Sequence, residues 1–174
     1  MPSRRSVRPT LRYRASPDEH VPSIGVLQNW NSLPSLPVCV VEVPGKGIGV
    51  VARRGLPAGT LVADYTFRLV VRARCRPGDY RVLVSGERCC VGKIDARTFG
   101  PPIDGVAQVG ALLNEPSPGM TANCVPRAGW TDPAGRVIRR GSFSLVTRRA
   151  VDVGEELTWH YGRTYGRRSY SYGH

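Results

Sequence analysis

Metal-ligating residues are scarce in this chain of 174 residues, which contains five cysteines and three histidines. No C-x-x-C pair occurs, whereas structural zinc sites usually draw on ligands paired at short spacing. The odd number of cysteines also argues against a framework of disulfides. We therefore expect reduced, partly buried thiols, no bound metal, and neither a catalytic zinc nor a histidine-based triad.

Long apolar runs are absent as well. No stretch approaches the ~20 apolar residues that a membrane helix requires, and none precedes a signal-peptide cleavage site. The hydrophobic fraction of 41% is nevertheless ordinary, so the chain can bury a core and is not a disordered basic protein. We expect one soluble, intracellular domain without membrane contact, and the oligomeric state stays open.

Lysine is almost missing, since all but Lys46 and Lys93 of the 25 basic residues are arginines. Against 13 acidic residues they give a net charge of +12. Such an excess predicts affinity for nucleic acid, chromatin or anionic lipid, although a compositional bias toward Arg, Gly, Pro and Ala explains it equally well. Five of the arginines lie in residues 1–22, where Ser and Pro replace any apolar pattern, which predicts a flexible basic arm.

Short β-branched runs separated by Gly and Pro begin at Val38. Strands are expected over residues 38–43, 48–53, 60–72, 80–84 and 88–94. One short helix is expected near residues 104–113, with Asp104 as its cap. A second β stretch covers residues 130–159 and turns at residues 132–135. The pattern predicts a mainly β fold with short helices and long loops.

One internal echo links residues 48–59 to residues 143–154. Each segment has a strand, two adjacent arginines, one apolar residue and a glycine turn. Two ordinary hairpins can coincide in this way, so both explanations stay open, and the repeat is too short for a solenoid.

Three segments carry residues suited to a binding or catalytic site. Gly45-Lys46-Gly47-Ile48-Gly49 allows close approach of a ligand to the backbone, but it lacks the strand–helix context of a dinucleotide fingerprint. Leu112-Leu113-Asn114-Glu115 places polar groups after the expected helix, where Asn114 could equally form a turn. Residues 155–162 read Glu-Glu-Leu-Thr-Trp-His-Tyr-Gly, and their large apolar side chains at Leu157, Trp159 and Tyr161 would face one side of a strand. An aromatic stripe in the core explains this alternation as well as a functional site does.

Taken in chain order with Asp64-Tyr65, Ile94-Asp95-Ala96 and Asn123-Cys124, these segments resemble the SET domain of protein-lysine methyltransferases. The resemblance covers about residues 36–165, and its most specific motif is the segment from Gly154 to Gly162. It implies small curved sheets around a knot-like C-terminal motif. No cysteine follows Tyr161, so the family's C-terminal zinc cluster is absent, and the tail 166–174 could close the active site instead.

The resemblance also implies roles for single residues. Tyr161 matches the catalytic tyrosine, Tyr65 lines the lysine channel, and Trp159 stands where an aromatic residue tunes how many methyl groups fit. The S-adenosyl-L-methionine site would comprise Gly45, Lys46, Gly47, Tyr80, Asn114, Glu115 and Tyr165.

The implied activity is transfer of a methyl group from S-adenosyl-L-methionine to a neutral lysine amine. The substrate would be a histone tail or nucleosome, the arginine arm would contact DNA, and the location would be nuclear or chromatin-associated, in a host nucleus if the protein is viral. Departures from the family pattern at Phe67, Glu115 and His160 keep open a catalytically degenerate SET domain that binds peptide or chromatin. A basic nucleic-acid-binding module is the third interpretation.

Overall fold

Strands dominate the fold, as the sequence predicts. The computed structural model describes residues 24–33, 35–71, 74, 81–83, 88–92, 94, 98–127 and 141–161. In chain order the elements are α1 (Ile24–Asn31), β1 (Val38–Val43), β2 (Gly47–Ala52), β3 (Leu61–Val71), β4 (Arg81–Leu83), β5 (Arg88–Gly92), the 3-10 turn η2 (Gly110–Leu112), β6 (Cys124–Pro126) and β7 (Ser142–Thr147). The expected arm 1–22, turn 132–135 and tail 166–174 lie outside the described residues.

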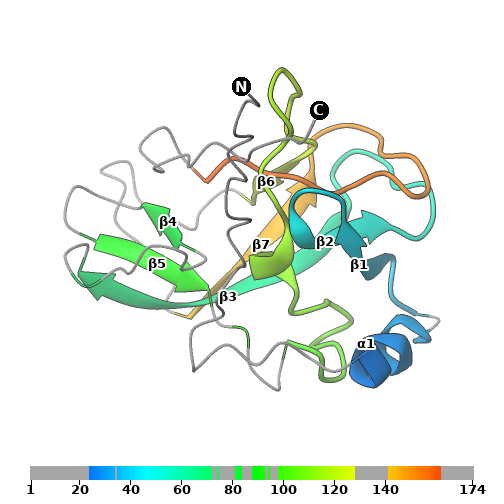
Figure 1. Ribbon diagram of the computed structural model, residues 1–174, viewed down its shortest axis with the longest axis horizontal. Coiled ribbons are helices and arrows are strands. Elements are labelled where there is room, and N and C mark those ends of the chain that lie inside the picture. The colour runs from blue at the N-terminus through cyan, green and yellow to red at the C-terminus, as the bar shows by residue number, and fades with distance from the viewer. Residues whose placement is uncertain are drawn as a thin grey trace, which may run out of the picture.

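Two antiparallel sheets form the framework. β1 pairs with β2, and the remaining strands form a five-stranded sheet in the order β4-β5-β3-β7-β6. β3 serves two neighbours in succession, because residues 61–66 pair with β7 and residues 67–71 pair with β5. A register shift between Leu61 and Ala63 interrupts the first of these pairings. In Figure 1, β3 accordingly runs across the molecule, with β4 and β5 beside one end.

The two echoed segments pair with each other around a local two-fold axis. Leu56 and Val151 occupy equivalent positions in the echo and exchange both backbone hydrogen bonds at 2.9 Å. The Gly59 N–H donates to the Thr147 carbonyl at 2.7 Å, and the symmetry-equivalent bond from Gly154 has the same length. The echo is therefore a structural repeat and not a coincidence, and it lays the C-terminal segment along β2.

The core is centred on the strands and on the C-terminal segment. Leu157, Trp159 and Tyr161 are buried, as their alternation predicts, while His160 between the last two is exposed. Burying a large apolar side chain contributes roughly 1.5–3 kcal/mol, so these three residues anchor the segment firmly.

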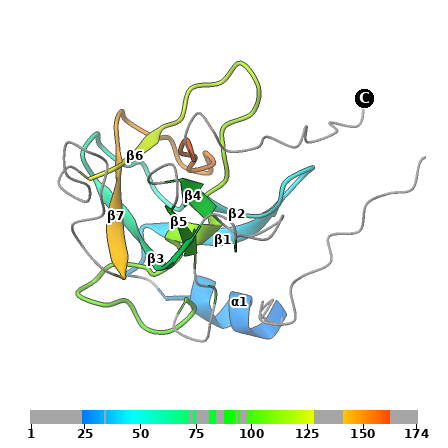
Figure 2. The same ribbon diagram turned by 90° about the vertical axis from the view of Figure 1, so that its left-hand side faces the viewer.

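Helix α1 has no counterpart in the sequence-based prediction, and it precedes the expected start of the domain at residue 36. Its Trp30 is buried and meets Phe99 edge-on at a centroid distance of 6.2 Å. The Asn31 side chain bonds both backbone polar groups of Val40, at 2.8 and 2.9 Å. The Arg53 guanidinium adds a bond to the Asn31 carbonyl. These contacts hold α1 beneath β1 and β2 (Figure 2).

The prediction of a helix near residues 104–113 is wrong over most of that range. Asp104 and Gly105 have φ values of 50° and 77° and form a two-residue turn. Ile103 and Val106 flank this turn and exchange both backbone hydrogen bonds. Asp-Gly is a preferred pair for hairpin turns that need positive φ at both positions, so turn chemistry overrides the apolar spacing here. Within residues 98–127, helical structure is confined to η2.

The thiols differ in their chemical state. Cys39, Cys90 and Cys124 are free, whereas Cys89 takes part in a disulfide, so the expectation of reduced thiols is wrong for Cys89. Burial raises the pKa of both Cys90 and Cys124 to about 12. Within the described part of the chain, no three His, Cys, Asp or Glu side chains are placed to hold a metal ion. In that same part, no helix has the length and apolar character to cross a membrane.

Candidate functional site

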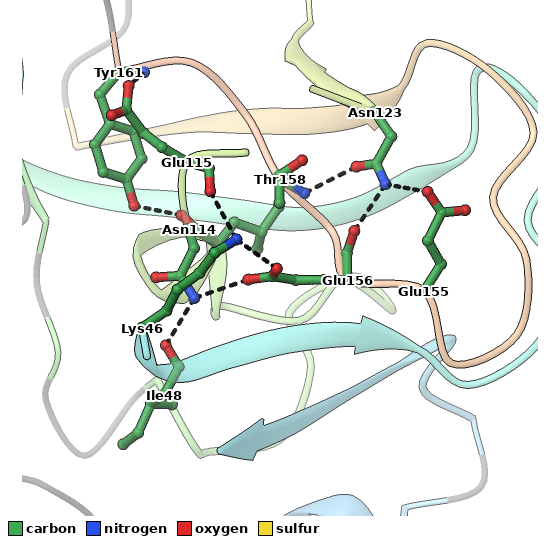
Figure 3. Close-up of polar contacts among 10 residues, drawn as sticks. Lys46, Ile48, Asn114, Glu115, Asn123, Glu155, Glu156, Thr158 and Tyr161 are labelled. Carbon is green, nitrogen blue, oxygen red and sulfur yellow. Dashed lines mark hydrogen bonds and ion pairs between the residues drawn. The ribbon is translucent and has the colours of Figure 1, made fainter. Parts of the chain in front are cut away.

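Backbone hydrogen bonds hold residues 155–161 from several sides. The Trp159 N–H donates to the Asn114 carbonyl at 3.0 Å, and the Cys124 N–H donates to the Thr158 carbonyl at 2.9 Å. The Leu157 N–H donates at 2.8 Å to a carbonyl of β2. Because these partners come from distant parts of the chain, the fold places the β1–β2 turn, the residues after η2 and the C-terminal segment side by side (Figure 3).

The Glu156 carboxylate lies where the β1–β2 turn, the residues after η2 and the C-terminal segment come together. Its Oε2 is 2.6 Å from Lys46 Nζ, and its Oε1 is 3.0 Å from Asn114 Nδ2. Asn114 Nδ2 also donates to the Ile48 carbonyl at 3.2 Å, and Lys46 Nζ donates to the Glu115 carbonyl at 3.1 Å. The Lys46 side chain is only 5% exposed. One carboxylate thus joins two residues that the motif resemblance assigns to a cofactor site (Figure 3).

The glycines of the 45–49 loop have identifiable structural tasks. Gly45 and Gly47 have φ values of 75° and 83° in and beside the β1–β2 turn, a conformation that side chains disfavour. A Cβ on Gly49 would lie 2.7 Å from Asn114 Nδ2 and 2.6 Å from a Val43 methyl carbon. Turn geometry therefore accounts for Gly45 and Gly47, while Gly49 makes room for the Asn114 amide.

Two hydrogen bonds, one from the hydroxyl and one from the backbone, link Tyr161 to the residues on either side of Asn114. Its hydroxyl donates to the Leu113 carbonyl at 2.5 Å, and its backbone N–H donates to Glu115 Oε1 at 3.2 Å. Tyr161 is buried, with 6% of its surface exposed. Glu115 therefore contributes its side chain to the Tyr161 backbone and its carbonyl to Lys46, which gives Glu115 a definite structural role.

An aromatic cluster adjoins Tyr161. The Trp159 ring meets Tyr161 at a centroid distance of 5.3 Å, and it meets both Tyr65 and Phe143 at 5.6 Å. Tyr65 stacks on Phe143 at 4.8 Å. Trp159 is 1% exposed, and its Nε1 is a buried side-chain donor without a partner in the described structure. Buried donors are nearly always paired, so this N–H is available to an acceptor that enters the cluster.

Asn123 holds the C-terminal segment from the side opposite Lys46. Its Oδ1 accepts the Thr158 N–H at 2.9 Å, and its Nδ2 donates to the Glu156 carbonyl at 2.8 Å and to Glu155 Oε1 at 3.1 Å. Glu155 also pairs with Arg149 at 2.5 Å, and this hydrogen bond is the main reason that the pKa of Glu155 is lowered to about 2. Asn123 therefore holds the backbone at Glu156 and Thr158 and also contacts the Glu155 carboxylate.

The structure brings most of the predicted site residues into one region. Lys46, Asn114, Glu115 and Tyr161 share one hydrogen-bonded network, and Trp159 links Tyr161 to Tyr65. Gly45 and Gly47 form the turn that carries Lys46. Tyr80 and Tyr165 lie outside the described residues.

Sequence reasoning assigned no catalytic or cofactor-binding role to three contributors to this region, which are Glu156, Asn123 and Phe143, although Glu156 and Asn123 stand within its motifs. Glu156 stands within the most specific motif. It does not share the apolar face of Leu157, Trp159 and Tyr161, and this difference could have identified it as a polar residue of the site. The pairing of Phe143 with Tyr65 depends on the β3–β7 register, which has no local signature.

No family model and no curated protein matches this sequence. Among 214 matching solved chains is a Plasmodium falciparum protein described as a candidate histone methyltransferase. It is 11% identical with a TM-score of 0.48, and the match covers 76% of this chain and 98% of that chain.

Proposed function

We propose that this protein is an S-adenosyl-L-methionine-dependent protein-lysine N-methyltransferase with a SET-like domain. The observation that carries the proposal is the hydrogen bond from the Tyr161 hydroxyl to the carbonyl of Leu113, the residue before Asn114. The motif resemblance assigns Tyr161 to catalysis and Asn114 to the methyl donor. Those two roles require neighbouring positions, and this contact supports them.

The donors and acceptors around Glu156 suit the amino-acid end of S-adenosyl-L-methionine, which carries an ammonium and a carboxylate. No described residue donates to Asn114 Oδ1, so this oxygen can accept a hydrogen bond from an ammonium. Lys46 has three N–H donors and spends two of them on Glu156 and Glu115, which leaves one for a carboxylate. The residues present therefore fit this cofactor, which supplies an activated methyl group on a sulfonium when bound.

Tyr161 would act by orientation. Because its proton is committed to the Leu113 carbonyl, its oxygen lone pairs can face the amine N–H of a substrate lysine and hold the nitrogen in line. Tyr65 and Trp159 would line the lysine channel and exclude water. A dry aromatic wall lowers the pKa of a lysine amine, and the ring faces attract the ammonium form before it loses its proton.

Chromatin is the proposed substrate class, and the nucleus the proposed location, which would be a host nucleus for a viral protein. Glu155 and Glu156 are paired with Arg149 and Lys46, so these acids are not free to attract a basic histone tail. With a net charge of +12, the protein would reach a histone lysine more readily through contacts to nucleosomal DNA.

Calorimetric titration with S-adenosyl-L-methionine tests the cofactor step. We expect the unmodified protein to bind, and Asn114→Ala to weaken binding about tenfold because a hydrogen bond to a charged group is lost. Asn29→Ala, on the exposed side of α1, is the matched control and should bind like the unmodified protein. Transfer of labelled methyl groups to nucleosomes then tests the reaction.

The alternatives give different results in the same experiments. Binding of the cofactor without methyl transfer to any lysine would favour a catalytically degenerate domain. A folded protein that binds DNA in a salt-dependent way, but not the cofactor, would be a nucleic-acid-binding module.

A further inference from the structure

The Asn114 side chain can face its neighbours in only one way. Its Nδ2 is 3.2 Å from the Ile48 carbonyl oxygen and 3.0 Å from Glu156 Oε1. Both neighbours are acceptors without hydrogen, so the amide NH₂ must face them, and a turned amide would set oxygen against oxygen. Asn114 therefore has no donor left and offers a ligand only the acceptor Oδ1.

Glu156 holds the amide in this state because it has two acceptor oxygens. Oε2 receives Lys46 at 2.6 Å, and Oε1 remains for Asn114. A glutamine at this position would have one acceptor oxygen for two donors, and its NH₂ group would repel either Lys46 or Asn114. Gly49 limits sideways movement of the amide, since even a Cβ there would lie 2.7 Å from Nδ2.

We infer that Glu156 is a positioning residue that fixes the orientation of the Asn114 amide and thereby makes the site selective for a ligand ending in an ammonium group. The inference rests on the proposed function, because the ligand in question is the amino-acid end of the methyl donor. It adds a specificity determinant that does not itself touch the ligand: Glu156 acts through Asn114, while Lys46 keeps one N–H for the ligand's carboxylate.

Three probes separate selectivity from overall binding. S-adenosyl-L-homocysteine has the complete amino-acid end, its des-amino analogue has hydrogen in place of the ammonium, and 5′-methylthioadenosine lacks this end altogether. In calorimetry, the unmodified protein should prefer S-adenosyl-L-homocysteine over the des-amino analogue by about tenfold or more. In Glu156→Gln this preference should fall to about twofold or less, because the Ile48 carbonyl is then the one remaining acceptor that orients the amide, and the new NH₂ group favours the turned form. The affinity for 5′-methylthioadenosine should be the same in both proteins.

Glu155→Gln is the matched control. Glu155 is the adjacent carboxylate, and its contacts are with Arg149, Asn123 and the Asp152 N–H rather than with Lys46 or Asn114. This variant should keep the full preference for the ammonium-bearing ligand. An unchanged preference in Glu156→Gln would overturn the inference and leave the proposed function standing. If the unmodified protein binds no S-adenosyl-L-homocysteine, the proposed function fails and the inference falls with it.

A second measurement uses the unmodified protein and does not depend on the folding of a variant. With ¹⁵N-labelled asparagine, the Nδ2 signal of Asn114 can be assigned by its loss in Asn114→Asp. Both amide protons should stay protected from solvent exchange when S-adenosyl-L-homocysteine binds, because they remain on Ile48 and Glu156. Loss of that protection on binding would show that the amide turns, and the inference would then be wrong.

Discussion

The Tyr161 hydroxyl donates a 2.5 Å hydrogen bond to the carbonyl oxygen of Leu113, and Asn114 follows directly in the chain. The phenol is therefore tied to the backbone of the proposed cofactor site before any substrate arrives. A polar group whose direction is set in advance need not reorganise during the reaction, which is the main advantage of a preorganised site.

Tyr161→Phe should lower methyl transfer on the order of 10²-fold or more, because the group that orients the lysine amine is removed. Binding of S-adenosyl-L-methionine should stay close to that of the unmodified protein. The free energy of unfolding should fall by about 1–3 kcal/mol, since the buried Leu113 carbonyl loses this partner. Transfer assays, calorimetry and denaturant titration measure the three effects. Equal transfer rates would remove Tyr161 from the mechanism.

Gly49→Ala should weaken both cofactor binding and stability. The new methyl group would lie 2.7 Å from Asn114 Nδ2 and 2.6 Å from a Val43 methyl carbon, so overpacking should cost about 1–3 kcal/mol. Gly55→Ala is the control, because a Cβ there meets nothing within 4 Å. Thermal unfolding and calorimetry compare the two variants. If both behave alike, the packing of the Asn114 amide on Gly49 does not matter for binding.

Thiol reactivity should follow burial. With the pKa of Cys90 and Cys124 raised to about 12, almost no thiolate forms at pH 8, whereas Cys39 is partly exposed. In the native protein we expect iodoacetamide to modify Cys39 at least about tenfold faster than the two buried thiols. Peptide mass spectrometry over a time course reads this directly. Rates that match in the native state would mean that the core opens readily to the reagent.

The Glu155–Arg149 pair should make stability depend on pH in one direction. The folded-state pKa of Glu155, about 2, lies below its ordinary value of 4.5, so the stabilisation is present above pH 4.5 and is lost as the pH falls toward 2. Because both side chains are partly exposed, Glu155→Gln should cost only about 1 kcal/mol at pH 7. Urea titrations from pH 7 to pH 3 should show this difference shrinking.

Glu42→Gln is the control for that experiment, because Glu42 is exposed on β1. At pH 7 this variant should lose less stability than Glu155→Gln, because no ion pair of Glu42 is broken in the described structure. A Glu155→Gln difference that grows toward low pH would contradict the assigned sign.

Removal of residues 1–22 should weaken nucleosome binding and flatten its dependence on salt, since five arginines are lost and each phosphate contact contributes roughly 0.9 to the slope. Cofactor binding should persist, because α1 and the residues around Glu156 are retained. Binding isotherms at several salt concentrations test this. Unchanged affinity and slope would exclude a DNA-binding role for the arm.

Local sequence signals were sufficient to predict the positions of most of the strands. The β-branched run at residues 38–43 coincides with β1, and β3 lies within the predicted range 60–72. Helix α1 has only eight residues, and it is stabilised by contacts made far along the chain, such as Trp30 with Phe99. Short helices are marginal on their own, so a local pattern could not indicate it. At Asp104-Gly105, the sequence also contained a turn signal, and in the structure the turn forms in place of the helix that the apolar spacing predicted.

By itself, the sequence determined the mainly β class, the positions of most strands but not of β6, and the residue types that resemble a methyl-transfer site. Only the tertiary structure decided that one carboxylate, Glu156, would join Lys46 to Asn114, and that the Tyr161 hydroxyl would face Leu113. Local patterns arise from backbone preferences and side-chain periodicity within a few residues. The site depends instead on how the two echoed segments pair across the fold, and that pairing is set by the packing of the whole core.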